Sequence, residues 1–273
     1  MNEYLMGAEG VLGDEHSFVR LVDTMPSLDP RYLYRDAAGF KPGDDFTAPG
    51  DQRIVDAARV SIAGEHVRPT SDDRRLIHYL VKNRHTTPLE QIRFTFHVRL
   101  PIFVARQWIR HRTGSFNEES ARYGQLRGDF YIPAQARLKK QAKRNKQGSA
   151  AHLVADPART QVQIREHSEA SYRLYEELLG VNPDDPDAEP DGLARELARA
   201  VLPVNVYTQW FWTTDLHNLM HFLTLRLHEH AQFETRAYAE AIVPMATAVA
   251  PYAMEAFDLH RERWRRALAG VDG

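Results

Sequence analysis

One segment of the sequence concentrates side chains that are able to bind a nucleotide. Residues 110–123 contain three arginines, one histidine, one asparagine, two glutamates and several hydroxyl groups. A guanidinium donates two parallel hydrogen bonds to a phosphate and stays charged at any working pH. The amide, carboxylates and hydroxyls supply the mixed donors and acceptors that grip the edge of a heterocycle. The segment therefore predicts a nucleotide site, placed where a helix passes into a loop.

A salt-bridged surface helix is the alternative interpretation of the same arginines. Cations are favourable at any helix C-terminus, so one arginine there carries little information. Here, however, the arginines interrupt and follow an apolar stretch that a purely structural helix would leave intact: Arg106, Arg110, Arg112 and Arg122. We therefore favour the nucleotide site.

The composition narrows the class of protein. The chain has 273 residues, of which 26% are charged, and its formal net charge of −2 is unlike that of a general nucleic-acid binder. No apolar run approaches the roughly 20 residues that span a bilayer. Residues 1–19 lack the basic start and apolar centre of a signal peptide. We therefore expect a cytoplasmic enzyme without nucleic-acid or membrane partners.

Two absences from the sequence exclude further classes of site. Cysteine does not occur, which excludes disulfides, thiolate metal sites and cysteine nucleophiles. No G-x-G-x-x-G motif follows a predicted strand, so a Rossmann fold is not expected.

Hydrophobic periodicity predicts a single α+β domain in which helices pack around an antiparallel sheet. The clearest strand spans 92–99, where apolar and polar residues alternate. Further strands are expected at 18–22, 129–133 and 204–212, the last with aromatic residues 210–212 in the core. Helices are expected at 52–62, from Ser71 or Asp72 through Val81, and at 102–112, 157–179, 192–202, 215–227, 231–243 and 251–267.

Four segments interrupt this pattern and are expected at the periphery. Residues 1–17 are interpreted as an N-terminal extension, and residues 26–50, 138–156 and 181–190 as surface insertions rich in proline, glycine or charge. The basic run at 137–148 is expected to be a solvated loop rather than part of a site.

Several motifs resemble those of the flavin-dependent thymidylate synthases (the ThyX family). Arg110-His111-Arg112, followed after seven residues by Ser120, reproduces the signature of that family. Further blocks match in the same order: residues 85–91, 94–98, 101–108, 201–203 and 223–226. The resemblance covers roughly Phe18 to Phe257, apart from the three insertions.

The resemblance implies an activity, a set of cofactors and an assembly. Members of this family methylate dUMP to dTMP with a methylene group from methylenetetrahydrofolate, which leaves as tetrahydrofolate. FAD, reduced by NADPH, supplies the hydride. The enzymes are homotetramers whose active sites are shared between subunits. The other thymidylate synthases attack uracil with a cysteine thiolate, which this chain lacks, so the missing cysteine agrees with the flavin signature.

By motif position, the resemblance also implies which residues bind the ligands. Residues implied to bind dUMP, with Arg199 donated by a neighbouring subunit, are Gln107, Trp108, Ile109, Arg110, Glu118, Glu119, Ser120, Ala121, Arg122, Arg199 and Arg226. Residues implied to bind FAD are Ser61, His85, Thr87, Arg110, His111, Arg112, Thr113, Asn117, Glu118, Asp215, Leu216, His217 and His221. No metal site is implied.

Arg226 corresponds to the catalytic arginine of the family. A guanidinium does not lose its proton in proteins, so Arg226 cannot be a general base. It can stabilise the negative charge that develops on N3 and O4 of uracil as C5 becomes nucleophilic.

Two alternatives concern single side chains. Ser120 closes the signature and invites a nucleophile interpretation, but a serine needs an adjacent base, so ligand hydrogen bonding is favoured. His217 and His221 stand four apart on a predicted helix, as in a zinc site, but Asn218 occupies the position of the glutamate in a zinc protease. The sequence departs from a common family pattern at this helix, since Asp215 and His221 stand where some members have asparagine and His217 replaces an arginine.

Two rival functions remain. One is a non-catalytic nucleotide-binding homologue that kept the fold and lost the activity. The other is a flavoprotein that methylates a different pyrimidine. The intact signature together with Arg226 favours the thymidylate synthase.

Overall fold

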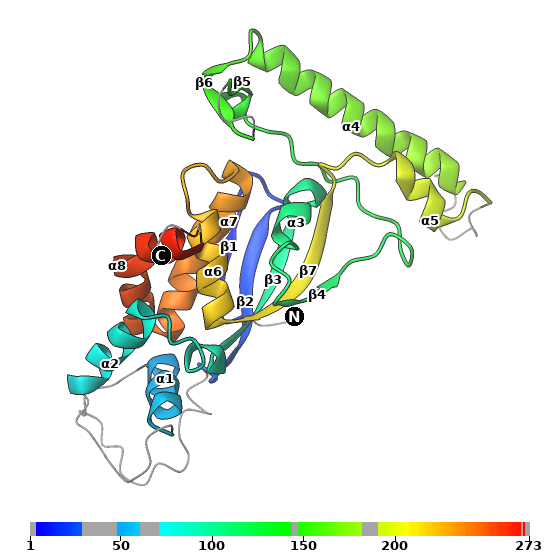
Figure 1. The fold of residues 1–273 in the computed structure, drawn as a ribbon. Helices are drawn as coiled ribbons and strands as arrows, with labels where there is room; N and C mark the ends of the chain where they lie inside the picture. The colour runs from blue at the N-terminus through cyan, green and yellow to red at the C-terminus, as the bar shows by residue number, and fades with distance from the viewer. Residues whose placement is uncertain are drawn as a thin grey trace.

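The computed structural model describes residues 4–28, 48–60, 71–143, 147–181, 191–268 and 270, without the side chains of residues 71 and 72. Its centre is a five-stranded antiparallel sheet in the order β1-β2-β3-β7-β4 (Figure 1). The strands are β1 (Met6–Glu9), β2 (Phe18–Met25), β3 (Arg93–Pro101), β4 (Ser115–Glu118) and β7 (Tyr207–Asp215). The predicted α+β class with an antiparallel sheet is confirmed.

The β3–β7 pair forms the middle of the core. The alternating residues Phe94, Phe96 and Val98 of β3 are fully buried, as the period of two predicts. In register with two of them, Trp212 lies opposite Phe96 and Trp210 opposite Val98, and both indoles are buried. This aromatic layer fixes the position of β3 and β7, to which β4 and α6 are attached.

Helices cover one face of the sheet. They are α1 (Pro49–Val60), α2 (Ser71–Lys82), α6 (Leu216–Arg226), α7 (Phe233–Val249) and α8 (Pro251–Leu268), with α3 (Ile102–Trp108) at the end of β3 and the short η1 (Leu89–Gln91) before it. In Figure 1, α6 and α7 lie beside the strands, and α8, α1 and α2 lie farther out. None of the helices in the described ranges is long and apolar enough to cross a membrane.

A second group of elements projects to the side of the sheet. It consists of η2 (Gln135–Arg137), β5 (Lys139–Gln141), β6 (Ser149–Leu153), α4 (Pro157–Leu179), α5 (Arg195–Ala198) and η3 (Arg199–Val201). The boundaries of α4 agree with the prediction because both caps are encoded locally. Asp156 accepts a hydrogen bond from the Arg159 amide at 2.9 Å, and Gly180 adopts the left-handed conformation at φ 66°.

Several predicted boundaries were wrong where tertiary pairing decides them. The helix expected at 102–112 ends at Trp108, because the chain then turns and pairs as β4 with β7. The helix expected at 192–202 is reduced to α5 followed by the 3₁₀ turn η3. The strand expected from 204 begins at 207, since the Val206 amide first closes a turn on the Pro203 carbonyl.

Three segments assigned to other structures also differ. The strand expected at 129–133 makes only one isolated bridge, from Phe130 to Val206. The loop expected at 137–148 contains β5, which pairs with β6 as a hairpin. Part of the expected N-terminal extension is β1, an edge strand of the main sheet. Residues 29–47, 61–70 and 182–190, where two insertions and Ser61 were placed, lie outside the described residues.

Candidate active site

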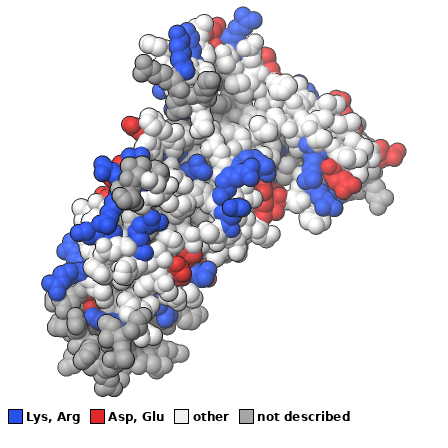
Figure 2. Space-filling model, viewed as in Figure 1, with Lys and Arg blue, Asp and Glu red and all other residues white. Residues whose placement is uncertain are grey.

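The segment 109–123 leads from the end of α3 into β4, an edge strand of the sheet. After α3, Ile109 caps the helix and the chain turns through His111 into β4. Pairing with β7 then fixes this strand, with Asn117 opposite Phe211 and Glu118 opposite Trp210. The turn leaves Arg110, Arg112 and Thr113 exposed. Figure 2 shows lysine and arginine side chains gathered over this end of α3.

Helix α6 delivers the second part of the site. Asp215 caps it by accepting hydrogen bonds from the amide of Asn218 at 2.9 Å and from its side chain at 2.7 Å. The buried stripe Leu216, Leu219, Met220 and Leu223 holds α6 against the sheet. The last turn therefore places Arg226 beside the end of α3.

Arg226, His111 and Gln107 meet where α3 and α6 end. The Arg226 Nε donates to Nε2 of His111 at 3.1 Å, and its Nη2 donates to the carbonyl oxygen of Gln107 at 3.2 Å. The His111 ring lies 5.7 Å from that of His221 and 5.0 Å from that of Phe222. The guanidinium is thus held at a defined position by residues 115 and 119 positions away in sequence.

The imidazoles of this cluster are neutral at pH 7. Burial, reinforced by the charge of Arg226 and by His221, lowers the pKa of His111 to about 4. Burial also lowers the pKa values of His217 and His221. It likewise lowers the pKa of Arg226, which stays charged because a guanidinium is so strongly basic. The cluster therefore carries one permanent cation among neutral rings.

His111 makes the ligand-free protein sensitive to acid. Because its pKa is about 4 when folded and about 6.5 when unfolded, the unfolded chain takes up the proton first as pH falls. Between pH 6.5 and 4 stability is therefore lost with decreasing pH. At pH 5 the difference of 6.5 − 5 = 1.5 units gives about 2 kcal/mol.

Urea unfolding at pH 7 and pH 5 should show His111→Gln losing less stability than wild type by about this amount. The exposed His167→Gln on α4 is the matched control, and an unchanged pH dependence in His111→Gln would contradict the assignment.

The chain after β4 forms a second group of site residues. Glu118 accepts a hydrogen bond from the Thr208 hydroxyl at 2.9 Å, which fixes its carboxylate. The amide of Glu119 donates to the Gln209 carbonyl, and the Ser120 hydroxyl accepts from the Arg122 amide at 3.3 Å. In the described part of the chain no general base contacts Ser120, which favours ligand hydrogen bonding over nucleophilic attack.

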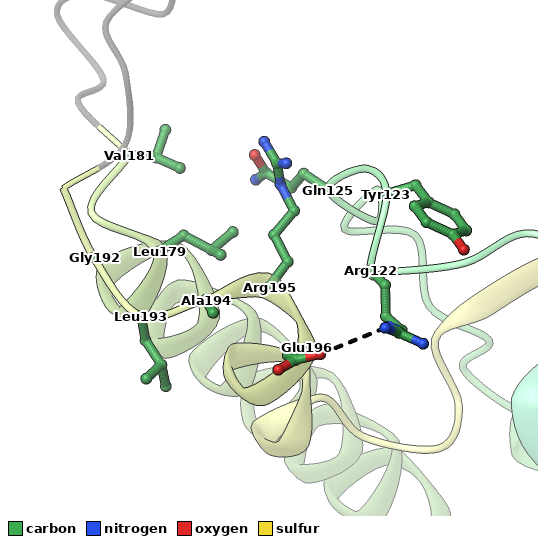
Figure 3. Close-up of a pocket in the computed structure, with 10 residues that line it drawn as sticks. All are labelled: Arg122, Tyr123, Gln125, Leu179, Val181, Gly192, Leu193, Ala194, Arg195 and Glu196. Atoms are coloured by element: carbon green, nitrogen blue, oxygen red, sulfur yellow. Dashed lines mark ion pairs between the residues drawn. The ribbon is translucent and has the colours of Figure 1, made fainter.

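Arg122 and Arg199 both contact Glu196. The Arg122 guanidinium lies 3.7 Å from the Glu196 carboxylate, and the Arg199 Nε donates to the Glu196 carbonyl at 3.2 Å. Figure 3 shows the pocket of about 430 Å³ that lies between Arg122 and Gln125 on one side and Leu179 and Leu193 on the other. Both arginines are exposed and therefore available to an anion.

A third group lies near the start of α6. His217 packs its ring 5.7 Å from that of Trp264, and the charges of Asp215, Glu90 and Arg84 act on its pKa. The turn with His85 and Thr87 lies between Arg84 and Glu90 in sequence, and both side chains are exposed. The turn and α6 are joined through the Leu216 amide, which donates to the Ile92 carbonyl at 2.9 Å.

Two of the predicted site residues have fully buried side chains. The indole of Trp108 is fully buried against Trp210, Trp212, Phe222 and Tyr238. Leu216 is fully buried in the same core.

Other residues at the site were missed by the sequence analysis. Glu196 joins Arg122 to Arg199, and Thr208 orients Glu118. Gln232 and Glu234 lie behind Gln107. No local pattern marks them, because each acts through a partner distant in sequence.

The donors present fit a flavin nucleotide. A dinucleotide needs cations for its pyrophosphate and polar atoms for its ring edges. Arg110 and Arg112 are exposed beside Asn117, and Nδ1 of His217 is buried with no hydrogen-bond partner among the described residues. Such an orphaned atom is costly unless a ligand satisfies it.

Comparison with known proteins identifies relatives of this chain. A family model described as thymidylate synthase complementing protein matches residues 45–252. The flavin-dependent thymidylate synthase of Gluconobacter oxydans is 45% identical over 248 residues, covering 90% of this chain and 72% of that protein. The enzyme of the same name from Treponema denticola is 46% identical over 214 residues, covering 78% of this chain and 76% of that protein.

A solved structure shows the same architecture. The UMP/dUMP methylase PolB from Streptomyces cacaoi, bound with 5-Br dUMP, superposes with a TM-score of 0.70 at 34% sequence identity. The match covers 88% of this chain and 94% of that chain. Every predicted site residue lies within the range 45–252 that the family model matches.

Proposed function

The chain belongs to the flavin-dependent thymidylate synthases, and from this premise we propose that it methylates dUMP at C5 to give dTMP. The observation that carries the proposal is the fixed guanidinium of Arg226, held by His111 and Gln107 at the edge of the cationic segment. Bound FAD supplies the hydride in this chemistry. NADPH is proposed as its reductant and methylenetetrahydrofolate as the carbon donor.

Arg226 acts electrostatically in this scheme. As uracil C5 becomes nucleophilic, negative charge grows on N3 and O4, and a donor already aimed at that charge needs no reorganisation. The half-buried position of Arg226 strengthens the effect, because fewer waters screen it. Gln107, Trp108, Ile109, Arg110 and the chain from Glu118 to Arg122 are proposed to hold the nucleotide.

The remaining contacts are proposed from the same premise. The exposed Arg122, together with Arg199 donated by a neighbouring subunit, is proposed to bind the phosphate of dUMP. Residues proposed for FAD are Ser61, His85, Thr87, Arg110, His111, Arg112, Thr113, Asn117, Glu118, Asp215, Leu216, His217 and His221. A homotetramer with active sites shared between subunits is also proposed.

A second substrate has one observation in its favour. The structural relative named above is called a UMP/dUMP methylase, so UMP is a candidate alongside dUMP. The relatives that are 45% and 46% identical are thymidylate synthases, which favours dUMP. The rival interpretation as an inactive nucleotide-binding homologue has no such support.

The proposal is tested with purified protein, FAD, NADPH and methylenetetrahydrofolate. We expect tritium release from dUMP labelled at C5 together with dTMP formation, and a yellow protein whose flavin is bleached by NADPH under anaerobic conditions. UMP labelled at C5 is run in parallel. A colourless protein that takes up no flavin and releases no tritium would overturn the proposal.

A further inference from the structure

A chain of hydrogen bonds connects Gln107 to Glu234. The Tyr131 hydroxyl donates to Oε1 of Glu234 at 3.1 Å, and Nε2 of Gln232 donates to Oε2 of the same carboxylate at 2.9 Å. Gln107 then donates from its Nε2 to Oε1 of Gln232. Four side chains from three separate segments are thereby connected.

The chain of hydrogen bonds runs in a fixed donor-to-acceptor direction. Two sources of positive charge lie beside the Glu234 carboxylate: the N-terminus of α7, in whose first turn Glu234 lies, and the Arg137 guanidinium at 4.0 Å. An ionised carboxylate only accepts hydrogen bonds. Gln232 must therefore turn its NH₂ towards Glu234 and its oxygen towards Gln107, which in turn must give its own NH₂.

This direction leaves one atom of Gln107 for a ligand. Its NH₂ is committed to Gln232, and its main-chain carbonyl accepts from Arg226. Among the residues that the structure describes, no donor reaches the side-chain oxygen of Gln107. That oxygen is an acceptor, and it stands on the same residue that holds the guanidinium of Arg226.

We propose that Gln232 and Glu234 are positioning residues that fix the amide of Gln107 with its oxygen towards the nucleotide, so that Gln107 accepts a hydrogen bond from an N–H or O–H group of dUMP. The inference rests on the proposed function, since it assigns Gln107 to the nucleotide site. Neither positioning residue touches the substrate; each acts through Gln107.

One substitution should reverse the donor-to-acceptor direction of these hydrogen bonds. In Glu234→Gln the new amide accepts from Tyr131 and offers NH₂ to Gln232, so Gln232 turns and Gln107 presents NH₂ to the nucleotide. We expect kcat/KM for dUMP to fall roughly 10- to 100-fold, as for other misplaced contacts, mainly through KM. Bound flavin should stay unchanged. Glu240→Gln makes the same chemical change on the same helix at an exposed ion pair with Arg236, and should stay within about twofold of wild type.

A double substitution restores the direction. In Gln232→Glu/Glu234→Gln, the carboxylate at 232 accepts from both Gln107 and the amide at 234, so Gln107 again presents its oxygen. We expect kcat/KM to recover to within about threefold of wild type, which a merely structural role of Glu234 does not explain. Gln232→Met, which breaks the chain, should resemble Glu234→Gln and serves if that variant does not fold.

The outcomes separate the two proposals. If wild type methylates dUMP but Glu234→Gln and Gln232→Met match Glu240→Gln, or the double variant is no better than Glu234→Gln, the positioning role is overturned and the function stands. If wild type neither binds nor methylates dUMP, the proposed function fails and the positioning role falls with it.

Discussion

Arg226→Ala should lower kcat for dUMP methylation on the order of 100-fold or more, while the protein still folds and binds FAD. Losing one fixed donor to developing charge has this size in other enzymes. The guanidinium is positioned in advance by His111 and Gln107, so its loss removes stabilisation that water does not replace. The measurement is tritium release from dUMP labelled at C5 under saturating substrate.

The controls for Arg226 separate charge from geometry. Arg226→Lys keeps the charge but loses the planar fork, so an intermediate rate is expected. Arg263→Ala removes an exposed arginine from α8 and should leave the rate unchanged. Near-normal turnover of Arg226→Ala would remove Arg226 from the catalytic role.

Gly114→Ala should disrupt the site through the backbone. A Cβ added at Gly114 would lie 2.3 Å from Nε1 of Trp212 and 3.0 Å from the Thr213 carbonyl oxygen. Trp212 is 1% exposed and packed between Phe96 and Trp108, so the turn must move instead. A shift of about 1 Å at a binding loop costs on the order of 100-fold. We expect a loss of that size in kcat/KM, together with reduced bound flavin.

Gly124 provides the matched control for Gly114. It directly follows the segment 109–123, and a Cβ there would meet nothing within 4 Å. Gly124→Ala should therefore keep the activity and flavin content of wild type. Equal behaviour of the two variants would mean that the turn at Gly114 tolerates the shift and does not position the site.

The sequence predicted the elements whose signals are local. The strand around Phe94 and Phe96 follows from a period of two, and α4 follows from a capping aspartate at one end and a glycine at the other. The resemblance to the family also pointed to Arg226 and to the segment 110–123. The signals for β3 and α4 lie within a few neighbouring residues, which is why both elements could be predicted from the sequence.

Contacts between residues far apart in sequence could not be predicted from local signals. The site depends on His111 meeting Arg226 across 115 residues, and Gln107 meeting Gln232 across 125. The end of α3 was misplaced because pairing of β4 with β7 outweighs helix propensity after Trp108. The prediction of a solvated loop for the basic run at 137–148 was wrong, because Arg137 stacks 3.7 Å above the Phe233 ring and lies beside Glu234.

The bond from Arg226 to His111 also decides which imidazole nitrogen carries hydrogen. A guanidinium has no lone pair to offer, so Nε2 of His111 must supply one. The single proton of the neutral ring therefore sits on Nδ1, the less common tautomer in free histidine. The opposite edge of the ring then presents a donor, suited to a carbonyl oxygen of the flavin or the pyrimidine.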